Sequence, residues 1–216
     1  MQSDTALQTS VLDELRWEPG VDSTEIGVTV KDGVVTLQGT VDSYAEKWAA
    51  EKAVKRLTGV KALAEELKVK LPGDSARTDA DIARAAENAL EWNVSVPDGI
   101  KVTVEDGFVT LEGQVDWQYQ KWAAGDAVNY LLGVKGLTNL ITVNPTVAPT
   151  DVKAKIEAAI KRNAILDAQE IKVQADGGKV TLTGNVSSWA ERDEAETAAW
   201  SAPGVNEVKD LIAVTY

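Results

Sequence analysis

Acidic residues are the side chains in this sequence with the most obvious capacity for chemistry. The chain carries 34 Asp and Glu residues, some of them paired, as in Glu65-Glu66, Asp193-Glu194 and Asp79-x-Asp81. Two carboxylates can divide acid and base roles when an enclosed, dry site separates their pKa values. None of these pairs recurs at the same place along the chain's internal repeats, and charged side chains are rarely buried. We therefore interpret the pairs as solvated surface and assign no catalytic residue.

The sequence contains no Cys and no His, which removes several other chemistries. Without them there is no thiol nucleophile, no Ser-His-Asp triad, no disulfide and no zinc site of the usual ligands. The Gly-rich stretch "DGG" at Asp176–Gly178 lacks the Lys-Ser/Thr and the helix that follow a phosphate-binding loop. We accordingly expect no metal and no cofactor, and we expect the protein not to be an enzyme.

The charge balance limits the partners. With 22 basic and 34 acidic residues, the net charge is -12. Such a surface repels phosphate backbones and anionic lipid at long range, so we expect no nucleic-acid partner. Self-repulsion also favours a monomer or a weak oligomer. The first residues show no basic stretch followed by an apolar core, which predicts a cytoplasmic protein as the sequence is written, or a periplasmic one if a leader has been removed.

The chain repeats itself three times. "DGVVTLQGTVDSYAEKW" begins at Asp32, "DGFVTLEGQVDWQYQKW" begins at Asp106, and the looser "GGKVTLTGNVSSWAERD" begins at Gly177. The steps from Thr36 to Thr110 and from Thr110 to Thr181 are 74 and 71 residues, and other positions keep the same steps. A period near 70 residues suits a small domain better than a solenoid unit. We predict three tandem modules over 1–73, 74–146 and 147–216, joined by short linkers rich in Pro and small polar residues.

Each module reads as α-β-β-α-β. Apolar residues at helical spacing come first, as in Ile82, Ala86 and Leu90, and alternating strand residues follow on both sides of a tight "DG" hairpin turn. Ser43-x-x-Glu46 and Ser188-x-x-Glu191 are capping boxes that begin the second helix. A Gly-Val pair and a last strand complete the unit. The predicted fold class is α+β, with two helices packed on one face of a three-stranded mixed sheet in each module and no large cleft within it.

The motif Val35-Thr36-Leu37-x-Gly39-x-Val41, with its two later copies, resembles the BON domain, named for bacterial OsmY and nodulation proteins. The resemblance covers nearly the whole chain and is closest to the OsmY-like group with tandem BON domains. It implies a non-enzymatic protein of the osmotic stress response. It also implies binding to phospholipid or to other envelope components, and chaperone activity in some members. The chain departs from the family in its lack of a signal sequence and of a lipobox Cys.

The motif glycines have two interpretations. Gly39, Gly113 and Gly184 occupy the same position in the three copies. A Cβ atom at a strand end or bend would clash with the backbone, which is a structural reason for Gly. The alternative is a small site where a ligand approaches the backbone.

Aromatic residues gather around the start of the second helix in every copy. Trp is abundant, with seven residues against one Phe. Such residues either pack against the neighbouring module or form a patch that faces a partner or a membrane interface, where Trp is suited to a half-wet surface. We take the following as the candidate partner-facing or lipid-facing residues: Tyr44, Trp48, Trp117, Trp122 and Trp189.

These observations predict a binding protein. The partners expected are a phospholipid membrane surface or protein clients that expose apolar segments. An adaptor whose modules bind one specific protein partner is the alternative.

Overall fold

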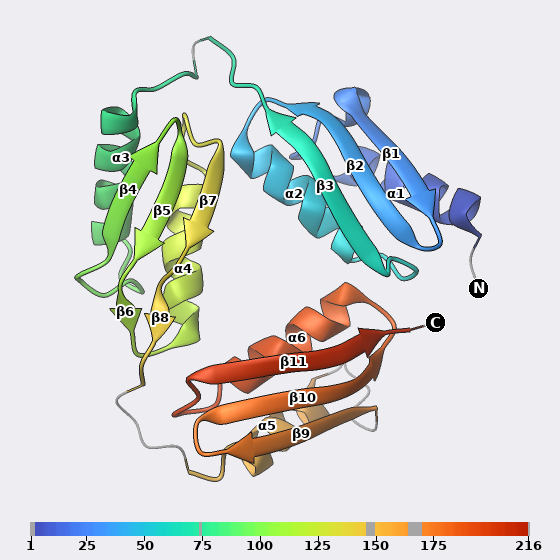
Figure 1. Cartoon of the computed structure of the whole chain (residues 1–216), viewed down its shortest axis with the longest axis vertical. Helices are drawn as coiled ribbons and strands as arrows, with labels where there is room; N and C mark the ends of the chain where they lie inside the picture. Colours follow the sequence, from blue (N-terminus) through green and yellow to red (C-terminus); the bar gives the residue numbers. More distant parts are fainter. Residues whose placement is uncertain (1–2, 74, 146–149, 164–169, 216) are drawn as a thin grey trace.

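The computed structural model describes residues 3–73, 75–145, 150–163 and 170–215 of the chain. Its strands form one mixed three-stranded sheet in each repeat, with an additional two-stranded piece in the second, and each repeat follows the order α-β-β-α-β (Figure 1). The predicted α+β architecture of tandem modules is confirmed.

The elements have these bounds. The first module contains α1 (Asp4–Trp17), a short 3-10 helix (Ser23–Glu25), β1 (Ile26–Lys31), β2 (Val34–Val41), α2 (Tyr44–Lys55) and β3 (Ala62–Val69). The second contains α3 (Asp79–Glu91), β4 (Lys101–Glu105), β5 (Phe108–Glu112), β6 (Gln114–Val115), α4 (Gln118–Asn129), β7 (Gly136–Asn139) and β8 (Thr142–Val143). The third contains α5 (Val152–Arg162), β9 (Ile171–Asp176), β10 (Lys179–Val186), α6 (Trp189–Trp200) and β11 (Glu207–Val214).

Each sheet has the second strand of its module in the middle. In the first module β2 pairs antiparallel with β1 and parallel with β3, and the third module repeats this order with β9, β10 and β11. A parallel pair needs a crossover connection, which the second helix supplies. In the second module the same ladder is interrupted, so that β6 and β8 form a separate two-stranded piece.

The hairpin between the first two strands is a tight turn that the first helix stabilises through a side chain. Asp32 and Gly33 have φ values of 53° and 80°, which is the backbone of a two-residue turn with both central residues left-handed. The Asp4 carboxylate at the start of α1 accepts hydrogen bonds from the backbone N–H groups of both residues, at 2.8 and 3.1 Å. Asp79 holds the second module's turn in the same way. The first helix is thus fixed to the sheet by its N-terminus.

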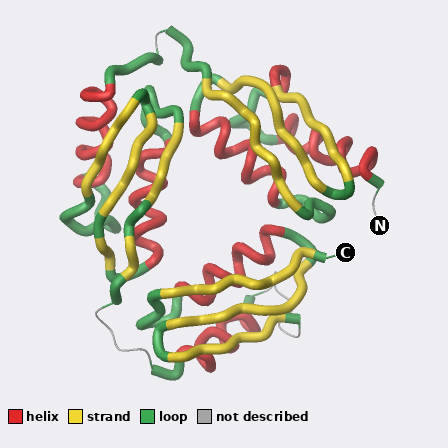
Figure 2. The backbone as a smooth tube through the Cα atoms, viewed as in Figure 1, coloured by secondary structure: helices red, strands yellow, loops and turns green. Residues whose placement is uncertain are grey.

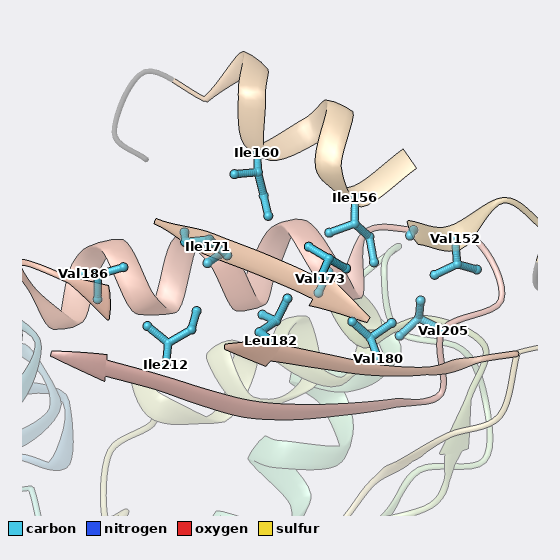
Figure 3. Packing of buried hydrophobic residues seen from close by; sticks show 13 residues of the cluster. Val152, Ile156, Ile160, Ile171, Val173, Val180, Leu182, Val186, Val205 and Ile212 are labelled. Atoms are coloured by element: carbon cyan, nitrogen blue, oxygen red, sulfur yellow. The ribbon is translucent and has the colours of Figure 1, made fainter. Parts of the chain in front are cut away.

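Each module has its own hydrophobic core. In the first module, Leu7, Val11 and Leu15 of α1 are buried against strand residues such as Leu37, and equivalent clusters form in the other two modules. Figure 3 shows Ile156 and Ile160 of α5 pointing toward the sheet of the third module. Full burial of one such aliphatic side chain stabilises the folded state by about 1.5–3 kcal/mol. Three small cores of this kind explain why the sequence repeats its apolar pattern three times.

The modules are arranged around a common centre. Figures 1 and 2 show the second helices, α2, α4 and α6, on the inner side of the arrangement and the first helices, α1, α3 and α5, on the outer side. Linkers join the first module to the second and the second to the third, whereas the third returns to the first without a direct covalent link. We call this arrangement the ring. Among the described helices, none combines the length and the apolar character that crossing a bilayer requires.

Candidate functional site

The ring brings the second helices together in three seams, where one module meets the next. In each seam the N-terminal half of one second helix lies near the C-terminal end of another. One position near the start of each second helix faces one position at the end of the next. The pairs are Trp48 with Tyr130, Trp122 with Ser201, and Asp193 with Arg56. Since the residues at these positions differ, the three seams have different chemistry.

Local sequence sets where each second helix begins. The Ser43 hydroxyl accepts a hydrogen bond from the Glu46 N–H, and the buried Glu46 carboxylate accepts from the N–H groups of Asp22 and Asp42. Ser188 and Glu191 cap α6 in the same manner. These contacts satisfy amides at the helix start that lack partners inside the helix. The residue after the capping position is thereby held at the seam.

The seam between the first and second modules is aromatic and partly basic. Tyr44 packs against the core of the second module, and Trp48 meets Tyr130 edge to face with ring centroids 6.1 Å apart. Lys52 Nζ lies 4.8 Å from the centroid of Trp48, so a cation of the chain covers that ring. Burial raises the pKa of Tyr44, Glu51 adds to the shift, and a backbone hydrogen bond with Leu137 partly opposes it.

The seam between the third and first modules is charged. Trp189 packs against the core of the first module, and the Arg192 guanidinium lies 4.9 Å from the centroid of its ring. A cleft of about 630 Å³ separates α2 from α6 beside this contact. Its charged lining is mainly cationic at the end of α2 and acidic on α6: Lys52, Lys55 and Arg56, with Glu51 beside them, on the first side, and Asp193 and Glu194 on the second. Opposite charges on facing walls favour this pairing of modules over others.

The seam between the second and third modules is almost wholly aromatic. A pocket of about 430 Å³ lies between the start of α4 and the end of α6. Four of its five lining residues are aromatic: Trp117, Tyr119, Trp122 and Trp200, with Ser201 as the fifth. Gln118, at the position of Tyr44 and Trp189, is buried at this end of α4. A third cavity of about 390 Å³ includes both Trp48 and Trp122.

A single module was expected to offer no large cleft, and the cavities described above lie between modules, where residues from two helices form the walls. Periodicity within one repeat carries no information about the contacts between repeats. The inter-module cavities were therefore outside the reach of the sequence pattern.

Each acidic pair has one exposed member, as expected of a solvated surface, and one that is only partly exposed. Asp79 fastens the turn of the second module, and the Glu65 side chain keeps only 24% exposure beside Lys47, with 3.4 Å between Nζ and Oε1. Burial raises the pKa of Glu65, and the Lys47 charge opposes that shift without cancelling it. Asp193 stays exposed on one side, but desolvation in the seam raises its pKa. Among the described residues, the acids form no cluster able to hold a metal ion.

Replacing Glu65 with glutamine is expected to stabilise the first module slightly at neutral pH, by less than about 1 kcal/mol. A carboxyl group whose pKa is higher in the folded than in the unfolded protein lowers the free energy of unfolding at a pH where both states are ionised. This loss of stability disappears as the pH falls below the pKa of the unfolded state. The melting temperature of the variant should therefore exceed that of the parent at pH 7, and the gain should vanish near pH 4. Asn139 holds this position in the second module, which shows that a neutral side chain fits. A gain in melting temperature that is the same at every pH would contradict the explanation.

The motif glycines lie at a close approach of two backbone segments. Gly39 has a φ of 133°, and a Cβ atom there would lie 2.0 Å from the Glu25 carbonyl oxygen. Gly184 meets the Glu170 oxygen at 1.9 Å, while Gly113 is nearest to the Ile100 side chain at 2.8 Å. At Gly39 and Gly184 the approach of a backbone oxygen thus requires Gly, which supports the structural interpretation. At Gly113 the nearest atom belongs to a side chain, and the positive φ of 152° is the stronger reason for Gly.

The structure distributes the predicted aromatic residues among the seams. Tyr44 and Trp189 contact neighbouring modules, and Trp48, Trp117 and Trp122 line the inter-module cavities. Packing between modules accounts for the first two. Trp48 lines a cavity and also packs against Tyr130 of the second module, whereas Trp117 and Trp122 are placed by the structure at cavity walls.

Sequence reasoning missed other aromatic residues. Trp17 and Trp92 hold the same place at the end of the first helix and are 82% and 84% exposed, and Trp200 belongs to the aromatic pocket. The equivalence of Trp17 and Trp92 in two copies was the signal that could have identified them.

A family model described as the BON domain matches residues 3–70, 78–145 and 150–216. The chain belongs to the BON domain family. It is 32% identical over 146 residues to osmotically-inducible protein Y of Escherichia coli (strain K12), which covers 63% of this chain and 70% of that protein. The resemblance inferred from the repeated motif is confirmed, with one BON domain for each repeat.

Solved structures show only loose similarity. CdsD, a structural protein of the type III secretion system of Chlamydia trachomatis, is 15% identical over 96% of this chain and 91% of its own, with a TM-score of 0.27. The periplasmic domain of the type III secretion inner-membrane protein PrgH from S. typhimurium is 10% identical over 89% and 96%, with a TM-score of 0.23. These scores are too low to bear on how the BON modules of this chain are used.

Proposed function

We propose that this BON protein is a non-enzymatic binding protein of the osmotic stress response that holds exposed apolar segments of client proteins at the cell envelope. The observation that carries the proposal is the outward exposure of Trp17 and Trp92 on modules whose cores are already complete. Large apolar side chains left in solvent by a folded protein are typical of contact surfaces. The similarity to a protein named as osmotically inducible supports the physiological setting.

Charge favours protein clients over a phospholipid surface. At a net charge of -12 the chain is repelled from anionic lipid, and binding of such lipid ordinarily relies on clusters of Lys and Arg. The basic residues at the end of α2 are engaged: Lys55 pairs with Glu51, and Arg56 pairs with Glu14 and Glu18. A phospholipid surface is the second partner to test. Zwitterionic vesicles are the suitable membrane, because they repel the acidic chain least.

The double variant Trp17→Ser/Trp92→Ser is expected to lose protection of an aggregating client. Truncating an exposed Trp anchor in an interface costs about 1–2 kcal/mol, so about tenfold more variant should be needed for the same light scattering. Leu211→Ser, which removes a half-exposed side chain from the third module, is the control. Equal protection by parent and double variant, in the absence of ATP, would contradict the proposal. Cosedimentation with phosphatidylcholine vesicles, lost in the same variant, would assign the surface to lipid instead.

A further inference from the structure

We propose that the pocket between α4 and α6 binds a quaternary ammonium group. Its walls are Trp117, Tyr119 and Trp122 from the start of α4, and Trp200 with Ser201 from the end of α6. This is a site separate from the outward surface of Trp17 and Trp92, and it goes beyond the proposed function.

The lining has the composition that a cation-binding pocket requires. Aromatic rings carry negative potential on their faces, and several rings around one space attract a cation that other pockets would exclude. Four of the twelve aromatic residues of the chain meet in this single pocket, drawn from two modules. The volume of about 430 Å³ lies in the range of small-ligand sites.

Within the described part of the chain, no Lys or Arg covers the rings of this pocket. Lys52 covers Trp48 at 4.8 Å and Arg192 covers Trp189 at 4.9 Å, which are the two cation–ring contacts in the described part of the chain. No described cation lies over Trp117, Trp122 or Trp200. In the first–second and third–first seams, a Lys or Arg of the chain thus covers a Trp ring. In the second–third seam the Trp rings are available to a cationic ligand.

The polar surroundings select the kind of cation. Among the residues that the structure describes, no carboxylate lines the pocket, so a primary ammonium group would lose its hydration without gaining charged hydrogen-bond partners. A quaternary ammonium group has no N–H to satisfy and is attracted to the rings alone. Glu196 accepts a hydrogen bond from Trp200 Nε1 at 3.1 Å, which places a negative charge at the edge of that ring and strengthens its attraction for a cation. The net charge of -12 acts in the same direction over a longer range.

Two sources carry this group: a free small solute such as choline, and the phosphocholine headgroup of a lipid. The pocket chemistry recognises the trimethylammonium group common to both. Calorimetric titration with choline chloride, with phosphocholine and with phosphatidylcholine vesicles therefore distinguishes them, since a headgroup site requires a response to the vesicles and a solute site does not.

The decisive comparison is between choline and its neutral analogue 3,3-dimethyl-1-butanol, which has the same shape without the charge. We expect choline to bind the full chain about tenfold more tightly than the analogue because the cation–ring attraction is lost. Trp122→Leu and Trp200→Leu should each weaken choline binding about tenfold. Trp92→Leu, which changes an 84% exposed ring of the same module, should leave it unchanged.

Because the variants could disturb the seam itself, a second measurement uses the unaltered protein. Choline should move the indole N–H resonances of Trp117, Trp122 and Trp200 and leave those of Trp17 and Trp92 in place. Equal affinity for choline and the neutral analogue, no saturable binding of choline at millimolar concentration, or shifts confined to other indoles would overturn the proposal. Loss of client protection without loss of choline binding would separate this site from the proposed function.

Discussion

Replacing Trp189 with serine is expected to detach the third module from the first and open the ring. Trp189 is the first residue of α6 and packs against the core of the first module, at the one seam that no linker spans directly. Because truncation of a largely buried Trp costs about 3 kcal/mol or more, and this ring is partly exposed, we expect about 2–3 kcal/mol of lost interaction. Small-angle scattering should report a larger radius of gyration, while the separate cores stay folded by circular dichroism.

Two controls accompany this variant. Trp17→Ser removes a Trp that is 82% exposed and should leave the radius unchanged. The charged walls of the same seam predict that high salt will expand the parent chain as well, because screening weakens the attraction between α2 and α6. An unchanged radius for Trp189→Ser at low salt would show that this contact does not hold the ring.

Replacing Gly39 with alanine is expected to unfold the first module. The new Cβ atom would lie 2.0 Å from a backbone oxygen, and a φ of 133° is unfavourable for any residue with a side chain. Neither can be relieved without separating β1 from β2, so we expect a loss above about 4 kcal/mol, at the extreme of single substitutions. Hydrogen exchange should show loss of protection in residues 3–70 and retained protection in the other two modules.

Gly99→Ala separates the two causes. Gly99 has a φ of 94°, but a Cβ atom there would meet no heavy atom within 4 Å. This variant should therefore show only backbone strain, about 1–2 kcal/mol. A Gly39→Ala protein as stable as the Gly99→Ala protein would mean that the close approach of Gly39 to Glu25 contributes nothing.

The sequence predicted what is local to one repeat. Alternation in β1, the Gly-containing turn at Asp32 and Gly33, and the capping residue Ser43 all depend on neighbours a few positions away, and each is found in the structure. Three copies in register strengthened these predictions, because chance similarity would not repeat them.

The seams could not be predicted in this way. Whether Trp189 lies in solvent or against the first module depends on how the modules are placed relative to one another. The repeat pattern in the sequence contains no information about that placement. The roles of Glu65 and Asp79 were missed for a related reason. Glu65 contacts Lys47, and Asp79 binds the hairpin turn of the second module, so both acids have partners far away along the chain that a local pattern of acids does not reveal. Equivalent positions with different residues, such as Trp48, Trp122 and Asp193, were the visible sign that the modules are not interchangeable.

The most direct test of this account is a distance measured across the ring. The chain has no native Cys, so spin labels can be placed through Cys residues introduced at the exposed positions Asp13 in the first module and Lys209 in the third. Double electron–electron resonance should give one narrow distance population in the parent chain and a broad one after Trp189→Ser. A broad distribution in the parent would show three modules moving independently on their linkers, and the seams described here would not exist as fixed sites.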